Sequence, residues 1–152
     1  MGKQSVVVRR GEGEALSVMG AGVRFVCPSE NTGKGWSMME VTVPKHAGPP
    51  SHHHPWDEAY YVVEGEVRFG MDGREVLVKS GDFLYAPGGT VHSFQGASEQ
   101  PARVLIFDAP AHAESFFRDV DREVKEMPRD LPKALEIGAR HQIHFVRQQG
   151  EK

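Results

Sequence analysis

The segment SHHHPWDEAYYVVEGE, residues 51–66, places three consecutive histidines shortly before an acidic residue and a β-forming run. In an extended chain, alternate side chains share a face, so we expect His52 and His54 to point together and His53 to point away. Glu58 follows His54 by four residues and adds a carboxylate. Two imidazoles and a carboxylate suit a divalent first-row metal, but ligands from one short stretch rarely complete a site. Taken alone, the triplet is equally typical of a solvated loop.

A second segment supplies the missing ligand. GDFLYAPGGTVHSF, residues 81–94, carries an isolated histidine, His92, within a strand-like run. Glycine and proline at both ends of its first strand indicate tight turns. Together with residues 51–66, this segment predicts a buried metal site made by His52, His54, Glu58 and His92.

The chain around these segments has an all-β pattern. Between Ser5 and Phe107, short apolar runs rich in β-branched and aromatic residues recur about every 8–12 residues, with turn residues between them, which favours a sandwich or barrel. The first run is SVVV, residues 5–8. Asp72 and Gly73 form a two-residue turn that predicts an antiparallel hairpin, because both residue types tolerate positive φ.

The pattern becomes helical after Pro110. A first helix is expected to carry an apolar face, and a second helix is expected over residues 132–142, followed by an extended piece over residues 143–146. We therefore expect a barrel over residues 1–110 and a helical extension over residues 111–152 that packs on its outside. The expected apolar face of the first helix consists of Phe116, Phe117, Val120, Val124 and Met127.

Composition limits the partners. The chain has 152 residues, 39% of them hydrophobic, with a formal net charge of −3. This charge gives no electrostatic reason for binding nucleic acid or an anionic membrane. A single cysteine, Cys27, cannot form an internal disulfide, and the N-terminal sequence has no long apolar region typical of a signal peptide. We expect a cytoplasmic protein without nucleic-acid or membrane partners.

At this point the residues resemble a known family. The spacing of His52, His54, Glu58 and Gly65 is similar to the first cupin motif, His-x-His-x3-Glu-x6-Gly. The spacing of Gly81, Pro87, Gly89 and His92 is similar to the second cupin motif, Gly-x5-Pro-x-Gly-x2-His-x3-Asn. Two positions depart from these motifs: His46 stands where the first motif opens with glycine, and Gly96 stands where the second closes with asparagine. Neither position is a metal ligand in the family.

The resemblance implies a cupin double-stranded β-helix, also called a jelly-roll barrel, with one divalent transition metal near its centre. The ligands would be His52, His54, Glu58 and His92, and Glu58 would also be the catalytic base. Such a ligand set accepts iron, manganese, nickel, cobalt, copper or zinc, so the metal stays open. The helical tail resembles those of single-domain cupins that are similar to quercetin dioxygenases.

Three functions remain open for a cupin. The first is a dioxygenase acting on a small hydroxylated aromatic or enol-type, flavonol-like compound. The second is a metal-dependent isomerase, decarboxylase or lyase of small sugars or keto acids, which would require cationic side chains in the cavity. The third is a non-catalytic small-molecule-binding cupin. By strand parity and position, the candidate substrate-pocket residues are Tyr60, Phe69, Met71, Phe94 and Met38.

We also expect a homodimer. An open sandwich has edge strands that need cover, and the apolar run over residues 5–8 is a candidate to pair with a partner sheet. The expectation also follows the habits of the cupin family.

Overall fold

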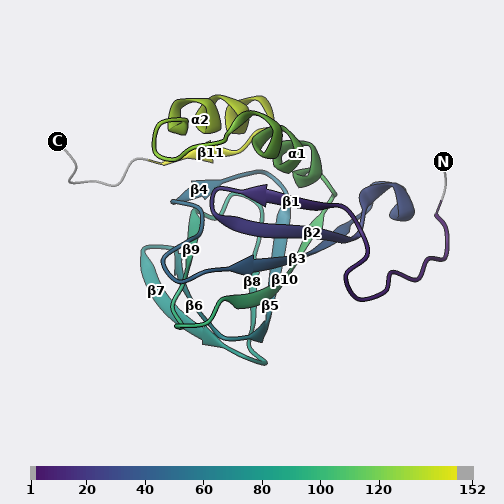
Figure 1. The fold of residues 1–152 in the computed structure, drawn as a ribbon, viewed down its shortest axis with the longest axis horizontal. Coiled ribbons are helices and arrows are strands. Elements are labelled where there is room, and N and C mark those ends of the chain that lie inside the picture. The colour runs from purple at the N-terminus through teal and green to yellow at the C-terminus, as the bar shows by residue number, and fades with distance from the viewer. Residues whose placement is uncertain (1–2, 147–152) are drawn as a thin grey trace.

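The computed structural model describes residues 3–146 as two antiparallel sheets facing each other, with two helices across one end (Figure 1). This architecture confirms the all-β class with a C-terminal helical extension. Residues 147–152 of the expected extension, and residues 1–2 of the expected barrel, lie outside the described residues. The six-stranded sheet has the order β1 (Ala15–Val18), β2 (Ala21–Cys27), β3 (Ser37–Val43), β10 (Ala102–Ala109), β5 (Asp57–Glu64) and β8 (Phe83–Ala86). The five-stranded sheet has the order β11 (His144–Phe145), β4 (His52–His53), β9 (His92–Gly96), β6 (Glu66–Met71) and β7 (Arg74–Lys79).

Strand alternation produces the core. Along β3, Met39, Val41 and Val43 are buried, whereas the residues between them face outward and are partly exposed. The opposite sheet contributes Val67 and Phe69 of β6, both with no exposed surface. Because side chains alternate between the two faces of a strand, each strand gives one apolar face to the space between the sheets.

The predicted hairpin is confirmed. Strands β6 and β7 pair with Met71 opposite Arg74, which leaves Asp72 and Gly73 as the two-residue loop. Both loop residues have positive φ, 52° and 76°. This conformation matches the right-handed twist of the strands that it joins.

The helices α1 (Ala113–Glu123) and α2 (Leu131–Arg140) and the strand β11 form one layer across an end of the barrel, at the top of Figure 1. A short 3-10 helix, η1 (Ser29–Thr32), follows β2. None of the helices among residues 3–146 is long and apolar enough to cross a membrane.

Buried polar groups fasten α1 to the barrel. The carboxylate of Asp108, at the end of β10, accepts hydrogen bonds from the backbone N–H groups of His112 and Ala113, both at 3.1 Å, and from the Ser37 hydroxyl. Glu114 accepts hydrogen bonds from the backbone N–H and the hydroxyl of Ser29. The start of α1 is therefore satisfied by side chains of the surrounding structure instead of by solvent.

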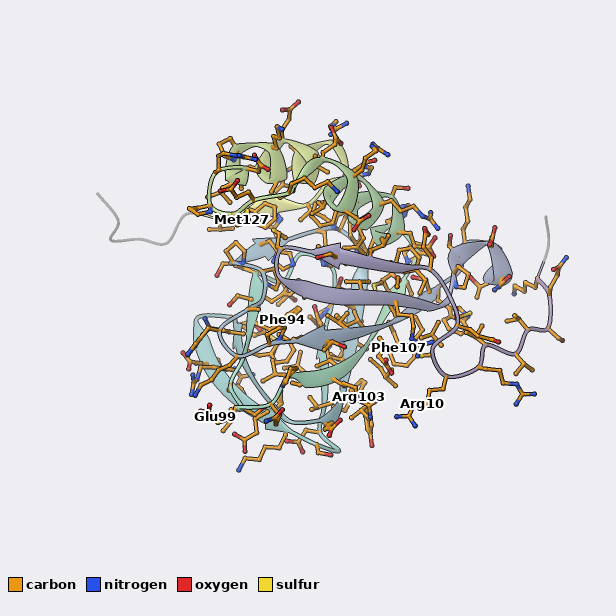
Figure 2. All side chains as sticks on the ribbon, viewed as in Figure 1. Arg10, Phe94, Glu99, Arg103, Phe107 and Met127 are labelled. Atoms are coloured by element: carbon orange, nitrogen blue, oxygen red, sulfur yellow. The ribbon has the colours of Figure 1, made fainter. Side chains whose placement is uncertain are left out.

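Two sequence expectations are corrected here. Residues 5–8 form no strand, and Val6 and Val7 are exposed to solvent. The first helix ends at Glu123, so Met127 lies in the connection between the helices and is exposed (Figure 2), while Val124 still packs against the core. The residue before a proline disfavours helical geometry, and Pro128 therefore excludes Met127 from a helix.

We expect Asp130→Asn to lower the melting temperature at neutral pH. The Asp130 carboxylate accepts hydrogen bonds from the backbone N–H groups of Lys125, at 2.9 Å, and Glu126, at 3.1 Å, and Arg129 contacts its other oxygen. These contacts lower the pKa of Asp130 to about 2. A lowered pKa stabilises the fold above the ordinary value of 3.8, and the stabilisation disappears as the pH falls through about 2.

The difference in melting temperature between wild type and Asp130→Asn should consequently be largest at pH 5–8 and shrink towards pH 2, as measured by circular dichroism. Asp72→Asn is the control, because Asp72 makes no side-chain hydrogen bond with the described residues and asparagine tolerates its positive φ. A difference that is equal at pH 7 and pH 2 would contradict the role of the ionised carboxylate.

Candidate metal centre

Three histidines meet inside the barrel. His52 on β4 and His92 on β9 are register partners across neighbouring antiparallel strands, and His54 lies just beyond β4 on the same face as His52. Their exposed fractions are 8%, 2% and 3% for His52, His92 and His54. One nitrogen from each ring can be chosen so that all three lie within 4.8 Å of one another. The cross-strand register thus brings together segments that are separate in the sequence.

Backbone carbonyls fix the tautomer of each ring. In every case the Nδ1 atom lies 2.8–3.0 Å from a backbone oxygen two residues away. A carbonyl oxygen only accepts, so Nδ1 carries the proton and Nε2 presents its lone pair. This is the outer-shell arrangement that orients histidine ligands in metal sites. The carbonyl partners are Pro50 for His52, Trp56 for His54 and Thr90 for His92.

Glu58 completes the cluster from the opposite sheet. One carboxylate oxygen lies 3.3 Å from His54 Nε2 and the other lies 3.3 Å from His92 Nε2, yet both nitrogens are buried without a hydrogen-bond partner. Imidazole lone pairs facing a carboxylate repel each other unless a cation lies among them. Two buried imidazole nitrogens without a hydrogen-bond partner beside a carboxylate therefore fit a bound cation, and His52, His54, His92 and Glu58 form a possible site for a divalent transition metal.

The pKa shifts reflect the contact between Glu58 and the imidazoles. Burial alone would raise the pKa of Glu58, but hydrogen bonds from His54 and His92 and their positive charge, when these imidazoles are protonated, lower it well below its usual range. Burial alone would lower the pKa of His92, but the contact with Glu58 raises it, whereas burial lowers the pKa of His52 to about 4. A bound divalent metal would replace the protons between the imidazoles and Glu58, because it binds neutral imidazoles and an ionised carboxylate.

Tyr60 holds the carboxylate in place. It lies two residues after Glu58 on β5, so both side chains point inward, and its hydroxyl donates a hydrogen bond to Glu58 Oε2. Tyr60 is 1% exposed, and burial together with Glu58 raises its pKa well above 10. The tyrosine therefore stays protonated and acts as a donor to Glu58.

An apolar cavity of about 60 Å³ adjoins the histidines. Its walls come from the β1–β2 hairpin, the inner faces of both sheets and the C-terminal layer. Among the described lining residues the ionisable groups are His52, His54, Glu58 and Tyr60, and none is lysine or arginine. The part of the wall made by the C-terminal layer consists of Phe116 and Phe117 of α1, Ile143, and Phe145 of β11.

The expected pocket residues divide into two groups. Tyr60 and Phe94 line the cavity. Phe69 is fully buried and packs against both of their rings, at centroid distances of 4.9 Å and 5.4 Å, so it supports the wall from behind. Met71 is partly buried near the end of β6 and is not a lining residue. Met38 is corrected, because it faces out of the sheet while its neighbour Met39 is fully buried.

Sequence reasoning missed several residues that surround the histidines and the cavity. Trp56 is 2% exposed and stacks on His54 with the ring planes 10° apart and 4.2 Å between centroids. Phe116 and Phe117 were expected on an apolar helix face, but the pattern could not say what that face covers. For Phe145 the sequence predicted only a place in a short extended segment and did not predict its position beside His52.

Comparison with known proteins identifies the class. Residues 39–108 match the family described as "Cupin domain". The quercetin 2,3-dioxygenase of Bacillus subtilis (strain 168) is 32% identical over 113 residues, 74% of this chain and 33% of that protein. The tetracenomycin polyketide synthase protein TcmJ of Streptomyces glaucescens is 28% identical over 82 residues, 53% of this chain and 55% of that protein. The chain thus spans about a third and about half of these two relatives.

A solved structure agrees on the fold. KdgF from Halomonas sp. superimposes with a TM-score of 0.66 at 20% identity, over 74% of this chain and 99% of that one. The two facing antiparallel sheets, the inward-pointing histidines, both motifs and the match over residues 39–108 together identify a cupin domain in this chain.

We expect His92→Ala to lose most of the bound metal and His53→Ala to keep it. His92 is buried with Nε2 aimed at Glu58, whereas His53 points to the other side of β4, where its ring lies 5.3 Å from that of His144. Elemental analysis of untagged protein should give close to one divalent metal per wild-type chain. Equal metal loss in both variants would contradict the assignment of His92 as a ligand.

Proposed function

We propose that this cupin is a metal-dependent dioxygenase that acts on a small, neutral, hydroxylated aromatic or enol-type compound of the flavonol kind. His52, His54, Glu58 and His92 would hold one divalent transition metal. The metal could be iron, manganese, nickel, cobalt, copper or zinc, because a set of three imidazoles and one carboxylate accepts all of them. The substrate would lie in the apolar cavity beside them.

The observation that carries the proposal is the composition of the cavity wall. Apart from the proposed ligands and Tyr60, the described lining residues are aliphatic, aromatic, glycine, proline or methionine side chains. A phosphate or carboxylate group would find no lysine or arginine among the described lining residues, so beyond the proposed metal nothing offsets its desolvation, which costs several kcal/mol. The wall therefore favours a neutral planar molecule over sugar phosphates and keto acids.

The likeness to quercetin 2,3-dioxygenase supports the same class of substrate. That relative is named for a flavonol, a hydroxylated aromatic compound with a hydroxyl group next to a carbonyl. The aligned part covers 74% of this chain and a third of the relative. The activity is consequently a proposal for this chain and depends on the site geometry described above.

The chemistry assigns a proton-transfer role to Glu58. A bound divalent metal would supply Lewis acidity, which lowers the pKa of a hydroxyl group that it contacts. Glu58 is ionised and buried, so it accepts that proton, while Tyr60 keeps donating to the same carboxylate. The strongly lowered pKa makes Glu58 a weak base, which is why only an acidified hydroxyl can transfer its proton. In a dioxygenase reaction both atoms of O2 enter the substrate, which supplies the electrons, so no separate reductant is needed.

Oxygen uptake tests the proposal directly. Protein loaded separately with each of the six metals should consume O2 when mixed with flavonols and related hydroxylated aromatics, and the compounds should stay unchanged under anaerobic conditions. If no metal form consumes O2 with any member of the panel, the dioxygenase proposal is wrong.

We expect Glu58→Gln to retain much of its metal and to lose turnover by about 10²–10⁴-fold per bound metal. Glutamine preserves an oxygen that can accept the Tyr60 hydrogen bond, and the three histidines still provide ligands. Turnover must be divided by metal content, because ligand loss alone also lowers activity. A metal-loaded Glu58→Gln protein that reacts at the wild-type rate would limit Glu58 to a ligand role.

A non-oxidative reaction is the second candidate. TcmJ is named as a polyketide synthase protein, and polyketide chemistry also involves neutral hydroxylated aromatics that fit an apolar wall. Such a reaction would proceed equally well without O2. A protein that binds a hydroxylated aromatic tightly and converts it under neither condition would be a binding cupin.

We also propose a homodimer, through a different surface from the one expected at first. The outer face of the six-stranded sheet carries Tyr61, Phe83 and Tyr85, exposed by 41%, 63% and 50%. Tyr61 is the register partner of both Phe83 and Leu105, so these side chains adjoin on one face, and Phe107 lies further along β10 (Figure 2). Because β8 is an edge of this sheet, an apolar face beside it favours cover by a second copy related by a two-fold axis.

We expect light scattering at micromolar concentration to give twice the chain mass of 16.8 kDa for wild type and the monomer mass for Phe83→Glu. A charge placed in the centre of an apolar interface cannot be desolvated without a partner. Leu77→Glu is the matched control, because Leu77 is 42% exposed on β7 of the other sheet. A monomeric wild type would exclude the dimer, and equal dissociation by both variants would exclude this face.

A further inference from the structure

The strand β11 extends the row of metal-site residues by one more side chain. Phe145 is the register partner of His52, and His52 is the register partner of His92. The three residues therefore lie in one row across β11, β4 and β9 and share the inner face, with 5.8 Å between the ring centroids of Phe145 and His52. An aromatic ring from the C-terminal end of the described chain is thus a direct neighbour of a proposed ligand.

The cover of the cavity comes from outside the matched cupin domain. The family match ends at residue 108, whereas Phe116, Phe117, Ile143 and Phe145 all line the cavity. In Figure 1 the layer of α1, α2 and β11 lies directly over the end of the barrel where β4 begins. The barrel supplies the ligands, and the extension supplies the apolar cover of the site.

The described cavity is too small for the proposed substrate. Its volume of about 60 Å³ is well below the roughly 300–1,000 Å³ of typical small-molecule sites. A flavonol has a fifteen-carbon skeleton of three rings and cannot enter a space that holds a few waters. One wall of the cavity must therefore move before such a molecule can bind.

The hydrogen bonds indicate which wall moves. The helix α1 is fastened to the barrel by Asp108, by Glu114 and by Asp121, whose carboxylate accepts from the backbone N–H of Ser17 at 2.8 Å. By contrast, β11 is a two-residue strand whose strand partner among residues 3–146 is β4, extended by one bond from Val146 N–H to the Ser51 carbonyl at 2.9 Å. Just before it, Ile143 N–H donates to the Gly138 carbonyl of α2 at 2.8 Å. Opening β11 breaks few bonds, and short edge segments are the parts of a fold that open most readily.

We propose that β11 is the gate of the metal site and that Phe145 is the residue that selects its substrate. When β11 separates from β4, Ile143 and Phe145 leave the cavity and a planar molecule reaches the histidines. When β11 closes, the Phe145 ring packs on the aromatic face of that molecule in the offset or edge-to-face geometry that aromatic pairs prefer. The aromatic class of substrate rests on the proposed function, whereas the gate itself does not.

A reversible lock tests the gate. His53 and His144 are register partners on the outer side of β4 and β11, away from the cavity. The Cβ atoms of directly opposed residues in antiparallel strands are about 4.5–5.5 Å apart, close to what a disulfide needs. The double variant His53→Cys/His144→Cys would therefore join β11 to β4 when oxidised and release it when reduced, without changing any residue that lines the site.

The probe is removal of Zn²⁺ from the loaded double variant by EDTA, which is larger than the cavity. We expect zinc loss to be at least tenfold slower in the oxidised protein than in the same protein reduced with a phosphine, which does not remove zinc efficiently. Wild type under the two conditions controls for the reagent, and mass spectrometry verifies the bond. Equal rates with the bond formed would overturn the gate.

The selective role of Phe145 has its own readout. Quercetin binding to the Zn²⁺-loaded protein without O2, followed by its absorbance, should weaken at least fivefold in Phe145→Ala, while Leu77→Ala, a truncation of an exposed apolar residue on β7, should bind like wild type. Unchanged binding in Phe145→Ala would overturn its role in selection.

Both readouts are separate from turnover. Slower zinc loss in the locked protein, combined with no O2 uptake by wild type, would leave the gate standing and reject the dioxygenase. Rapid turnover by wild type, combined with equal rates of zinc loss from the oxidised and reduced double variant, would support the dioxygenase and reject the gate. The failure of the gate and the failure of the proposed function are thus distinguishable.

Discussion

The structure depends on an electrostatic conflict at its centre. Three imidazoles have Nδ1 fixed by a backbone carbonyl, and two of them, His54 and His92, direct Nε2 towards the Glu58 carboxylate inside an apolar barrel. Without water to screen them, these groups repel one another, and a divalent cation among them turns the repulsion into bonding. The strands β4, β5 and β9 therefore hold their side chains in an arrangement that only a bound cation fully stabilises. The rigid register of the two sheets keeps the arrangement from relaxing.

The dry surroundings of this centre also limit its chemistry. In an apolar cavity the contact between Tyr60 and Glu58 is stronger than in water, and charged substrates are penalised because they lose hydration without gaining a lysine or arginine partner. A cavity with cationic side chains would select anions, whereas this one selects by shape and by contact with aromatic rings. The apolar wall that favours a neutral aromatic substrate therefore also increases the electrostatic effect of a proton transfer to Glu58.

Much of this arrangement could be predicted from the sequence, because it follows from local spacing. The separation of His52 from His54 sets their common face by strand alternation, and the positive φ required at Asp72 and Gly73 fixes a hairpin. The orientation of Met38 was also readable, since Glu40 and Thr42 share its parity while Met39, Val41 and Val43 form the apolar set. The position of Phe145 was not readable. It depends on pairing between β11 and β4, segments separated by most of the barrel, and on a helix layer whose docking no periodicity specifies.

The division of labour between barrel and extension follows from this difference. Ligands must be held within a fraction of an ångström, and only strands inside a hydrogen-bonded sheet provide that precision. Residues that choose a substrate need to contact it closely and also to let it pass, which a fully paired strand cannot do. A two-residue strand at the edge of the five-stranded sheet meets both needs, because it takes part in the register that aligns Phe145 with His52 and yet is held by few bonds. Gly138 of α2 allows this close approach, since a Cβ at that position would lie 2.8 Å from the Ile143 carbonyl oxygen and 2.9 Å from the Phe145 ring. The helical layer therefore packs β11 against the site, while the small number of hydrogen bonds made by β11 keeps the free energy of its opening low.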